Sequence, residues 1–304
     1  MIFEGDINTL VAAMRLKRDC IKNGQPQNGP RILFVGGGGV MYGCEGGATV
    51  TALYETGYAE VFDWVFGLST GAPGITYFLS GNPRVGTSVY YEECCSKEFL
   101  SLIRLHRPID TTFLDRVFRG ETGKGFNLTQ IFSHRTELLI GMTNADTGKQ
   151  RIVRPKTDEE LYSSILASIS IPGFTGKPIE HNGRFYTDGA MSNPLPLKQL
   201  VKTLNPTHVL VLPHRTKEFG GKPAWLETAA NNSIFRHRIT PIMRAVAYKR
   251  SERLTESIRF VREEATIPIV IAWSQGTISK FERDKQKVIA AINQAEQQWI
   301  QVLS

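Results

Sequence analysis

The sequence predicts an α/β protein, a three-layer α/β/α sandwich with a mainly parallel central sheet and a C-terminal helical extension. Short β-prone apolar runs alternate with longer segments of helical periodicity along most of the 304 residues. Such alternation favours parallel strands that are covered by helices on both faces. Glycine-rich turns follow the first two apolar runs, at residues 36–39 and 67–71.

The predicted elements follow in order along the chain. Strands are expected at the apolar runs 31–35, 61–67, 136–142, 150–153, 184–187, 208–212 and 267–273. Helices are expected in the amphipathic segment before the polar, turn-rich stretch 22–30, and at 43–57, 70–80, 88–105, 158–168, 197–203, 236–262 and 280–302. Thr157 is the expected N-cap of helix 158–168, and residues 146–148 predict a hairpin turn.

Composition and charge narrow the class of protein. The chain is 41% hydrophobic and 21% charged, which is an ordinary globular composition. Its longest apolar stretches, of about ten residues, are too short to span a bilayer. The net charge of +7 suits an anionic partner such as a lipid surface, although it also favours plain solubility. The four cysteines include the adjacent Cys94 and Cys95 and show no zinc-type spacing, so we expect reduced thiols in a cytoplasmic protein.

Residues 67–71 read G-L-S-T-G, which is a G-x-S-x-G motif. The motif lies between a predicted strand and a predicted apolar helix, whose first turn tolerates Pro73. In such a turn the Ser69 hydroxyl is exposed at the sheet edge, and the positive end of the helix dipole favours a developing negative charge. The motif therefore indicates a serine hydrolase with Ser69 as the nucleophile, and a simple helix N-cap is the other role open to this serine.

Four consecutive glycines, residues 36–39, follow the first predicted strand and precede a predicted helix. Glycine lets the backbone approach a ligand and turn its N–H groups inward, so this loop could stabilise an oxyanion. A second interpretation is a nucleotide-binding loop completed by Gly43, with Glu60 or Asp63 as the acid that binds the ribose. That interpretation would make the protein a dinucleotide-dependent oxidoreductase.

An aspartate stands at the end of a third predicted strand. The sequence D-G-A at residues 188–190 comes directly after strand 184–187. An aspartate in this place can point into a site, although turn aspartates are also common. The following stretch 191–196 contains two prolines, which would make this corner rigid.

These motifs, in this order, resemble the patatin-like phospholipases from about Arg31 to Pro213. The stretch S-I-S-I-P-G-F at 168–174 is similar to the segment that the family places before its aspartate. The stretch K-F-E-R-D at 280–284 is similar to an extension carried by a bacterial branch of the family. We therefore expect a patatin-like fold, with a catalytic domain at residues 28–215 and a C-terminal helical extension at 216–304 packed on its core.

The resemblance further implies a serine–aspartate dyad, in which Ser69 is the nucleophile and Asp188 accepts its proton. The loop N–H groups would hold the oxyanion, and the substrate would be a lipid ester cleaved through an acyl-enzyme. No metal or other cofactor is implied. We expect contact with an anionic membrane surface and no nucleic-acid partner. The implied oxyanion donors are Gly37, Gly38, Gly39 and Val40, and the supporting motif glycines are Gly67, Gly71 and Gly189.

The glycine loop departs from the family pattern in one respect. Three residues separate Gly39 from Gly43, and alignment on Gly43 places Tyr42 where the family has an arginine. The loop therefore lacks a fixed positive charge, which bears on the choice of head group. This departure makes a non-catalytic lipid-binding protein a further alternative.

Three other features leave alternatives open. His214 follows strand 208–212 and could complete a Ser-Asp-His triad of the α/β-hydrolase type. Residues 84–130, rich in Phe and Leu, are either a lid or buried core. Between residues 236 and 262 eight Lys or Arg stand against two Glu, which fits either a lipid-binding basic face or the solvated side of a core helix.

Overall fold

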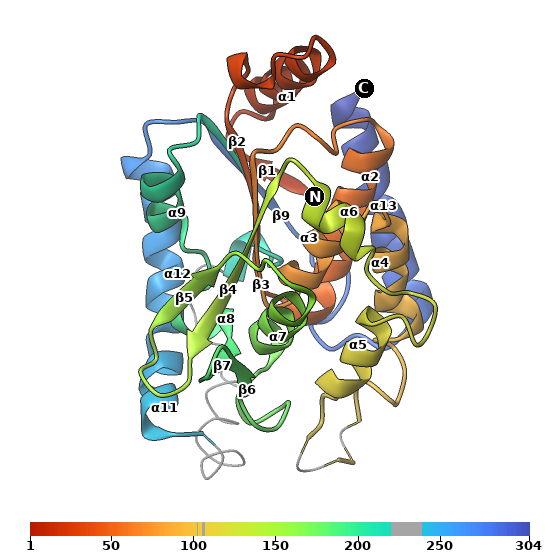
Figure 1. Cartoon of the computed structure of the whole chain (residues 1–304), viewed down its shortest axis with the longest axis vertical. Coiled ribbons are helices and arrows are strands. Elements are labelled where there is room, and N and C mark those ends of the chain that lie inside the picture. Colours follow the sequence, from red (N-terminus) through yellow and green to blue (C-terminus); the bar gives the residue numbers. More distant parts are fainter. Residues whose placement is uncertain (102, 105–106, 220–238) are drawn as a thin grey trace.

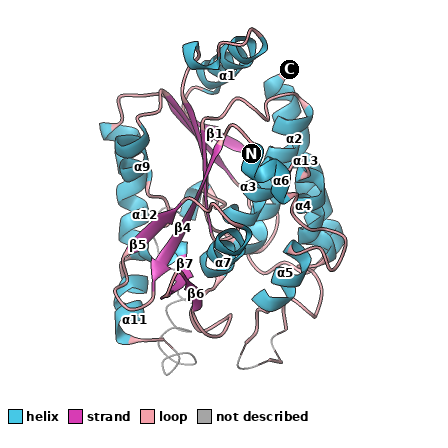
Figure 2. Cartoon of the chain, viewed as in Figure 1, coloured by secondary structure: helices cyan, strands magenta, loops and turns pink. Residues whose placement is uncertain are grey.

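A computed structural model describes residues 1–101, 103–104, 107–219 and 239–304. Within these residues the chain forms a nine-stranded sheet with helices on both faces (Figures 1 and 2). The predicted three-layer α/β/α architecture is thus confirmed. The predicted start of the basic helix at residues 236–238 and residues 102, 105 and 106 of the predicted lid lie outside the described residues.

The central strands of the sheet are parallel and its margins are antiparallel. The strand order is β1-β9-β8-β2-β3-β4-β7-β6, with β5 paired to β4. Pairing is parallel from β9 through β8, β2 and β3 to β4, whereas β1, β5, β6 and β7 add antiparallel pairs. The strand bounds are β1 Ile2–Glu4, β2 Ile32–Gly36, β3 Trp64–Leu68, β4 Glu137–Asn144, β5 Gln150–Val153, β6 Ile179–His181, β7 Arg184–Asp188, β8 His208–Leu212 and β9 Ile269–Trp273.

Two apolar cores lie on the two faces of this sheet. Side chains alternate between the faces along a strand, so Ile32 and Phe34 of β2 enter one core and Leu33 and Val35 enter the other. Burial on both faces explains why this strand is apolar throughout. Helices α9 and α12 cover one face, and α2, α3, α7 and α13 cover the other (Figure 1).

Helices α2, α3, α7 and α9 begin within one residue of their predicted starts. Their bounds are α1 Ile7–Lys22, α2 Gly43–Glu55, α3 Gly71–Leu79, α4 Pro83–Glu92, α5 Thr111–Phe118, α6 Leu128–Ser133, α7 Asp158–Ile169, α8 Gly189–Ser192, α9 Leu197–Leu204, α11 Pro241–Tyr248, α12 Arg250–Arg259 and α13 Lys285–Leu303. Four shorter turns are η1 Pro26–Asn28, η2 Val40–Tyr42, η3 Lys217–Phe219 and η4 Phe260–Glu264. The Thr157 side chain caps α7, as predicted, by accepting from the Glu160 N–H.

Two predicted helices are wrong in extent. The predicted helix 88–105 is the shorter α4, which starts earlier because Pro83 suits the first helical turn. After α4 the described residues 93–101 form turns and a short bridge, in which Phe99 and Leu100 are buried, whereas Ile103 is 92% exposed. The predicted helix 236–262 is divided into α11 and α12, and Pro241 lies at the start of α11 because proline is disfavoured in a helix interior.

The segment after residue 215 contributes to the core of the fold. Strand β9 pairs with β8 in the sheet, which confirms the predicted strand 267–273. Helix α13 packs along α2, and its Trp299 is fully buried. The Trp299 ring meets Phe3 edge-on, with ring centroids 5.0 Å apart. This helix therefore ties the last residues of the chain to the first strand.

Replacement of Trp299 by alanine is expected to destabilise the fold by about 3 to 5 kcal/mol, because it leaves a large cavity between α13 and β1. Urea unfolding followed by circular dichroism measures this change. Ile300→Ala, at a position that is 39% exposed on the same helix, serves as the control. Equal losses of stability in the two variants would contradict the packing described.

Candidate active site

Ser69 lies in the tight turn between β3 and α3. Its backbone has φ of 49°, in the left-handed region that non-glycine residues rarely adopt. The Ser69 N–H donates to Ser168 Oγ at 2.8 Å, and that hydroxyl donates to the Gly141 carbonyl at 2.7 Å. These two bonds hold the turn against α7 and β4, so the strained conformation is maintained by its surroundings.

The glycines of the serine motif lie where backbones approach closely. A Cβ on Gly71 would stand 2.4 Å from the carbonyl oxygen of Gly36, and one on Gly67 would stand 2.7 Å from the Cα of Ala72. No larger side chain fits there without movement of the backbone. The turn that carries Ser69 therefore packs directly on the end of strand β2.

Asp188 is the last residue of β7, directly opposite Met142 of β4. Its Oδ2 accepts a hydrogen bond of 2.7 Å from Ser69 Oγ, although 119 positions separate the two residues. Its Oδ1 accepts from the Ala190 N–H at 2.7 Å, and its carbonyl accepts from Thr143 Oγ1 at 2.8 Å. Both carboxylate oxygens are thus held, and one of them faces the serine hydroxyl. Gly189 lies beside this carboxylate and packs on the Gly141 carbonyl.

Burial raises the pKa of Asp188 above its ordinary value of 3.8. The side chain is only 4% exposed, so the charged form loses much of its hydration. Arg250, the Ser69 hydroxyl, the Ala190 N–H and Lys280 each act in the opposite direction and favour the carboxylate. The result is a carboxyl group with a raised pKa that still has stabilising partners in its charged form, which suits a proton acceptor.

The glycine loop lies against the serine. A Cβ on Gly38 would stand 2.7 Å from the Ser69 Cβ and 3.1 Å from its Oγ. Within the described part of the chain, the N–H groups of Gly38, Gly39 and Val40 have no hydrogen-bond partner. Val40 has φ of 53°, which is unusual for a β-branched residue and shows that the loop holds a strained shape.

One predicted oxyanion donor is corrected by this geometry. The Gly37 N–H donates to the Leu212 carbonyl at 2.8 Å. That bond continues the β2–β8 pairing by one residue beyond the strand, so this N–H points along the sheet. The loop therefore offers three of the four predicted donors, namely Gly38, Gly39 and Val40.

His214 supports the glycine loop and does not contact Ser69 in the described structure. Its Nδ1 lies 2.7 Å from the Gly37 carbonyl oxygen. Because a carbonyl can only accept, Nδ1 carries the proton. Its Nε2 faces α2, where it lies 2.1 Å from the position that a Cβ on Gly46 would take. Nδ1 is thus engaged by the loop, Nε2 is buried against the helix without a hydrogen-bond partner among the described residues, and the triad alternative finds no support in this geometry.

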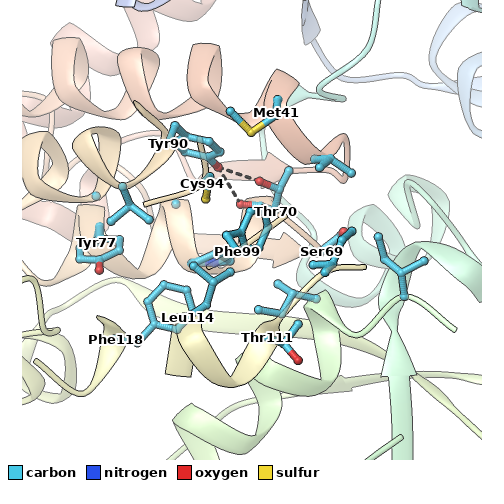
Figure 3. A pocket seen from close by; sticks show the side chains of 18 residues that line it. Met41, Ser69, Thr70, Tyr77, Tyr90, Cys94, Phe99, Thr111, Leu114 and Phe118 are labelled. Carbon is cyan, nitrogen blue, oxygen red and sulfur yellow. Dashed lines mark hydrogen bonds between the residues drawn. The ribbon is translucent and has the colours of Figure 1, made fainter. Parts of the chain in front are cut away.

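An apolar cavity opens beside Ser69 (Figure 3). It runs between α3, α4 and α5 to Tyr77 and Phe118, and the Thr70 and Tyr90 hydroxyls bond to each other at 2.7 Å on its wall. The predicted lid segment 84–130 supplies a large part of this wall. Its lining residues there are Gly86, Val89, Tyr90, Cys94, Phe99, Ile109, Thr111, Leu114 and Phe118.

The surroundings of Tyr42 contain positive charge that sequence reasoning missed. Burial raises the pKa of the Tyr42 phenol, Glu45 raises it further, and Arg215 lowers it. Arg215 also interacts with Asp188, as do Arg250 and Lys280. Arg250 lies in the basic run 236–262 and Lys280 in the K-F-E-R-D stretch, but neither pattern indicated a position beside the serine, and Arg215 belongs to neither.

The described residues offer neither a metal-binding cluster nor a membrane-spanning helix. These residues contain no cluster of three or more His, Cys, Asp or Glu side chains arranged to hold a metal ion. None of the helices described here combines the length and apolar character that a membrane crossing requires.

The fold and the site place the chain in a known class of α/β protein. A model of the family described as patatin-like phospholipase matches residues 33–201. Because the match covers more than half of the 304 residues, the chain belongs to the patatin-like phospholipase family.

Two solved structures are similar to this chain. VipD from Legionella pneumophila aligns with a TM-score of 0.45 and 11% identity, over 90% of this chain and 66% of that one. The type III effector protein ExoU aligns with a TM-score of 0.33 and 13% identity, over 90% of this chain and 61% of that one. This chain therefore spans less than two thirds of either protein. A search of curated proteins finds no match.

Acidification is expected to destabilise the protein through His214. Burial lowers the pKa of this histidine from 6.5 to about 4. Between those values the unfolded chain binds a proton that the folded chain excludes, so the free energy of unfolding decreases as pH falls from 6.5 to 4. The effect is on the order of 3 kcal/mol at most, since one pKa unit corresponds to about 1.4 kcal/mol.

The variant His214→Asn isolates this contribution, because asparagine tolerates positive φ and can donate to Gly37 but does not titrate. Urea unfolding of both proteins between pH 4 and pH 8 measures the difference. A smaller dependence on pH is expected for the variant. Identical pH dependence in the two proteins would show that His214 is not buried in its neutral form.

Proposed function

We propose that the protein is a lipid acyl hydrolase, a serine esterase of the phospholipase or lysophospholipase type. The observation that carries this proposal is the 2.7 Å hydrogen bond from Ser69 Oγ to Asp188 Oδ2 at the mouth of an apolar cavity. A nucleophile and its base lie in contact there, beside a space suited to an acyl chain. Membership of the patatin-like phospholipase family supports the same activity.

The geometry suggests the order of the chemical steps. Ser69 Oγ attacks the ester carbonyl carbon while its proton passes to Asp188 Oδ2. The N–H groups of Gly38, Gly39 and Val40 stabilise the oxyanion, assisted by the N-terminal end of α3. Collapse of this intermediate expels the alcohol, which takes the proton from Asp188 and leaves the acyl group on Ser69.

The second half of the reaction repeats the first with water as the nucleophile. Asp188 accepts a proton from the attacking water, and the same three N–H groups hold the second oxyanion. Collapse then releases the fatty acid and returns the proton to Ser69 Oγ. The proposed mechanism uses no cofactor, because the dyad and the loop supply the base, nucleophile and electrostatic stabilisation.

We also propose a division into domains, a cellular location and a membrane contact. We place the catalytic domain at residues 28–215 and the C-terminal extension at 216–304, with a cytoplasmic location and contact at an anionic membrane surface. The +7 charge supports the last of these. A dinucleotide-dependent oxidoreductase is disfavoured, because Gly38 packs on Ser69 and Gly39 packs on His214, where a pyrophosphate would have to lie.

A fluorophosphonate probe tests the nucleophile directly. The wild type is expected to be labelled, and Ser69→Ala is expected to lose all labelling because the attacking oxygen is gone. Asp188→Asn is expected to slow labelling and ester hydrolysis on the order of 10³-fold, since the base is removed. Unlabelled, folded wild type would favour the lipid-binding alternative, and undiminished hydrolysis in Asp188→Asn would contradict the assigned base.

The acid limb of the pH profile is expected to lie above the ordinary aspartate value of 3.8, because burial raises the pKa of Asp188. Only the deprotonated carboxylate accepts the serine proton, so kcat/KM rises with pH through this raised pKa. Hydrolysis of a monomeric ester between pH 3.5 and pH 8 measures the limb, with circular dichroism as the control for folding. A midpoint at or below 3.8 would contradict the environment described for Asp188.

A further inference from the structure

The apolar cavity beside Ser69 follows one face of helix α3. Four of its lining residues are Thr70, Pro73, Gly74 and Tyr77. Their spacing of i, i+3, i+4 and i+7 places them on the same side of the helix. The cavity therefore runs along α3 for about two turns, and Figure 3 shows Ser69 and Tyr77 at its opposite ends.

The cavity wall near the serine presents apolar surface although it carries two hydroxyl groups. The Thr70 and Tyr90 hydroxyls lie 2.7 Å apart, and the Thr70 carbonyl lies 3.4 Å from the Tyr90 hydroxyl. These polar groups satisfy one another, and Pro73 and Val89 supply apolar surface beside them. An alkyl chain can therefore lie along this wall without depriving a buried polar group of its partner.

The Tyr77 ring is fixed in place at the far end of the cavity. Its hydroxyl donates to the Lys124 carbonyl at 2.7 Å, and its ring centroid lies 4.6 Å from that of Phe126. Helix α4 also approaches the ring closely, because a Cβ on Gly86 would stand 2.4 Å from Tyr77 Cγ. A movement of the ring out of the cavity would break the hydrogen bond of its buried hydroxyl, so the ring forms a firm boundary.

Phe118 of α5 completes this end of the cavity. Its ring centroid lies 6.2 Å from that of Tyr77, and it stacks on Phe126 at 5.0 Å with an interplanar angle of 18°. Tyr77 and Phe118 are each only 2% exposed. In the described part of the chain the cavity therefore ends against these two rings, and Phe126, which does not line the cavity, packs against both.

Gly74 leaves the middle of the cavity open. Glycine is unfavourable in the interior of a helix, and at Gly71 close packing explains it. At Gly74, apart from its own helix backbone and its chain neighbours, no described atom would lie within 4 Å of an added Cβ. Close packing therefore does not require this glycine, whereas an unobstructed cavity does.

The length of this cavity sets the length of the chain that it can hold. Tyr77 follows Thr70 by seven residues, which corresponds to roughly 10 Å of helix at about 1.5 Å per residue. An extended chain gains about 1.2 Å per bond, so roughly eight carbons occupy this distance. Because helix side chains tilt towards the N-terminus, the Tyr77 ring lies no further along the helix than its own Cα.

We propose that Tyr77 and Phe118 limit the acyl chain to about eight carbons, so that the substrates are esters of acids no longer than this. This inference rests on the proposed function, because it requires the acyl group that is transferred to Ser69 to lie in the apolar cavity. It adds a selectivity that the dyad and the glycine loop do not provide, since those groups face only the reacting ester.

A series of esters that differ only in chain length tests this limit. We use the p-nitrophenyl esters from butyrate to dodecanoate, each below the concentration at which it aggregates. For wild type, kcat/KM is expected to rise about fourfold per added methylene group as far as the octanoate, because each such group buries further apolar surface. From the decanoate onward no further rise is expected. A rise that continues at the same slope to the dodecanoate would overturn the limit.

Variants at the middle and at the end of the cavity are expected to shift this profile in opposite directions. Gly74→Leu is expected to lower the octanoate-to-butyrate ratio of kcat/KM on the order of 10- to 100-fold, because its side chain takes the place of two to three methylene groups. Tyr77→Leu and Phe118→Leu are each expected to raise the decanoate-to-octanoate ratio about 4- to 15-fold, because up to two further methylene groups are then buried.

A general loss of stability does not produce opposite shifts, and each ratio cancels any effect of a variant on the chemistry that all the esters share. Gly74→Ala provides a second, milder variant at the same position. It is expected to shift the profile in the same direction as Gly74→Leu, with a melting temperature at least equal to that of wild type because alanine favours the helix.

Phe78→Leu is the matched control for loss of a buried ring from α3. Phe78 directly follows Tyr77, is 1% exposed and does not line the cavity. Its ring packs instead against Phe34 and Phe62, with centroids 6.3 Å and 6.0 Å away. Its profile is expected to equal that of wild type. A change as large as that of Tyr77→Leu, or unchanged profiles in both Gly74→Leu and Tyr77→Leu, would assign the chain to another place and overturn the proposal.

Failure of this inference and failure of the proposed function give different results. Wild type that is labelled at Ser69 and hydrolyses the butyrate, but shows no break in its chain-length profile, retains the proposed function and loses the limit. Wild type that hydrolyses no ester of the series and resists the fluorophosphonate probe loses both.

Discussion

The site depends on the close packing of three backbone segments, namely the serine turn, the end of β2 and the glycine loop. The serine turn packs on Gly36 at the end of β2, and Gly38 continues from there to face the serine side chain. Parallel strands β2 and β3 end at the same edge of the sheet, so the proposed nucleophile and the proposed oxyanion donors lie next to each other. Asp188 enters the same place on β7, through its pairing with β4. The contact between serine and aspartate therefore follows from the order of the strands.

The proposed dyad has no histidine, which places particular demands on its aspartate. A fully hydrated carboxylate is a weak base at neutral pH, whereas a buried and unassisted one would remain protonated. Asp188 lies between these limits, because burial raises its pKa while Arg250, Lys280 and two hydrogen bonds favour the charged form. Because Asp188 is the proposed base, the proposed mechanism requires no proton transfer by His214. It stays neutral and holds the Gly37 carbonyl.

Features that depend on residues adjacent in the sequence could be predicted from the sequence alone. The strands flanking Ser69, the turn that carries it and the glycine loop beside β2 all have local signals, and the fold class followed from them. Other features depend on pairing between distant segments. The Gly37 N–H is engaged because the pairing of β2 with β8 continues for one residue beyond the end of β2, and no local pattern indicates that. The three cations were missed for the same reason, since each approaches Asp188 through a contact with a different element.

The C-terminal part of the chain acts on the site through the fold itself. Strand β9 pairs with β8, and β8 leads directly to His214 and Arg215. The segment after β9 returns to the glycine loop at Met41 before α13 packs on α2. Tyr42 therefore does not leave the site without positive charge, because Arg215, three residues after β8, interacts with both Tyr42 and Asp188.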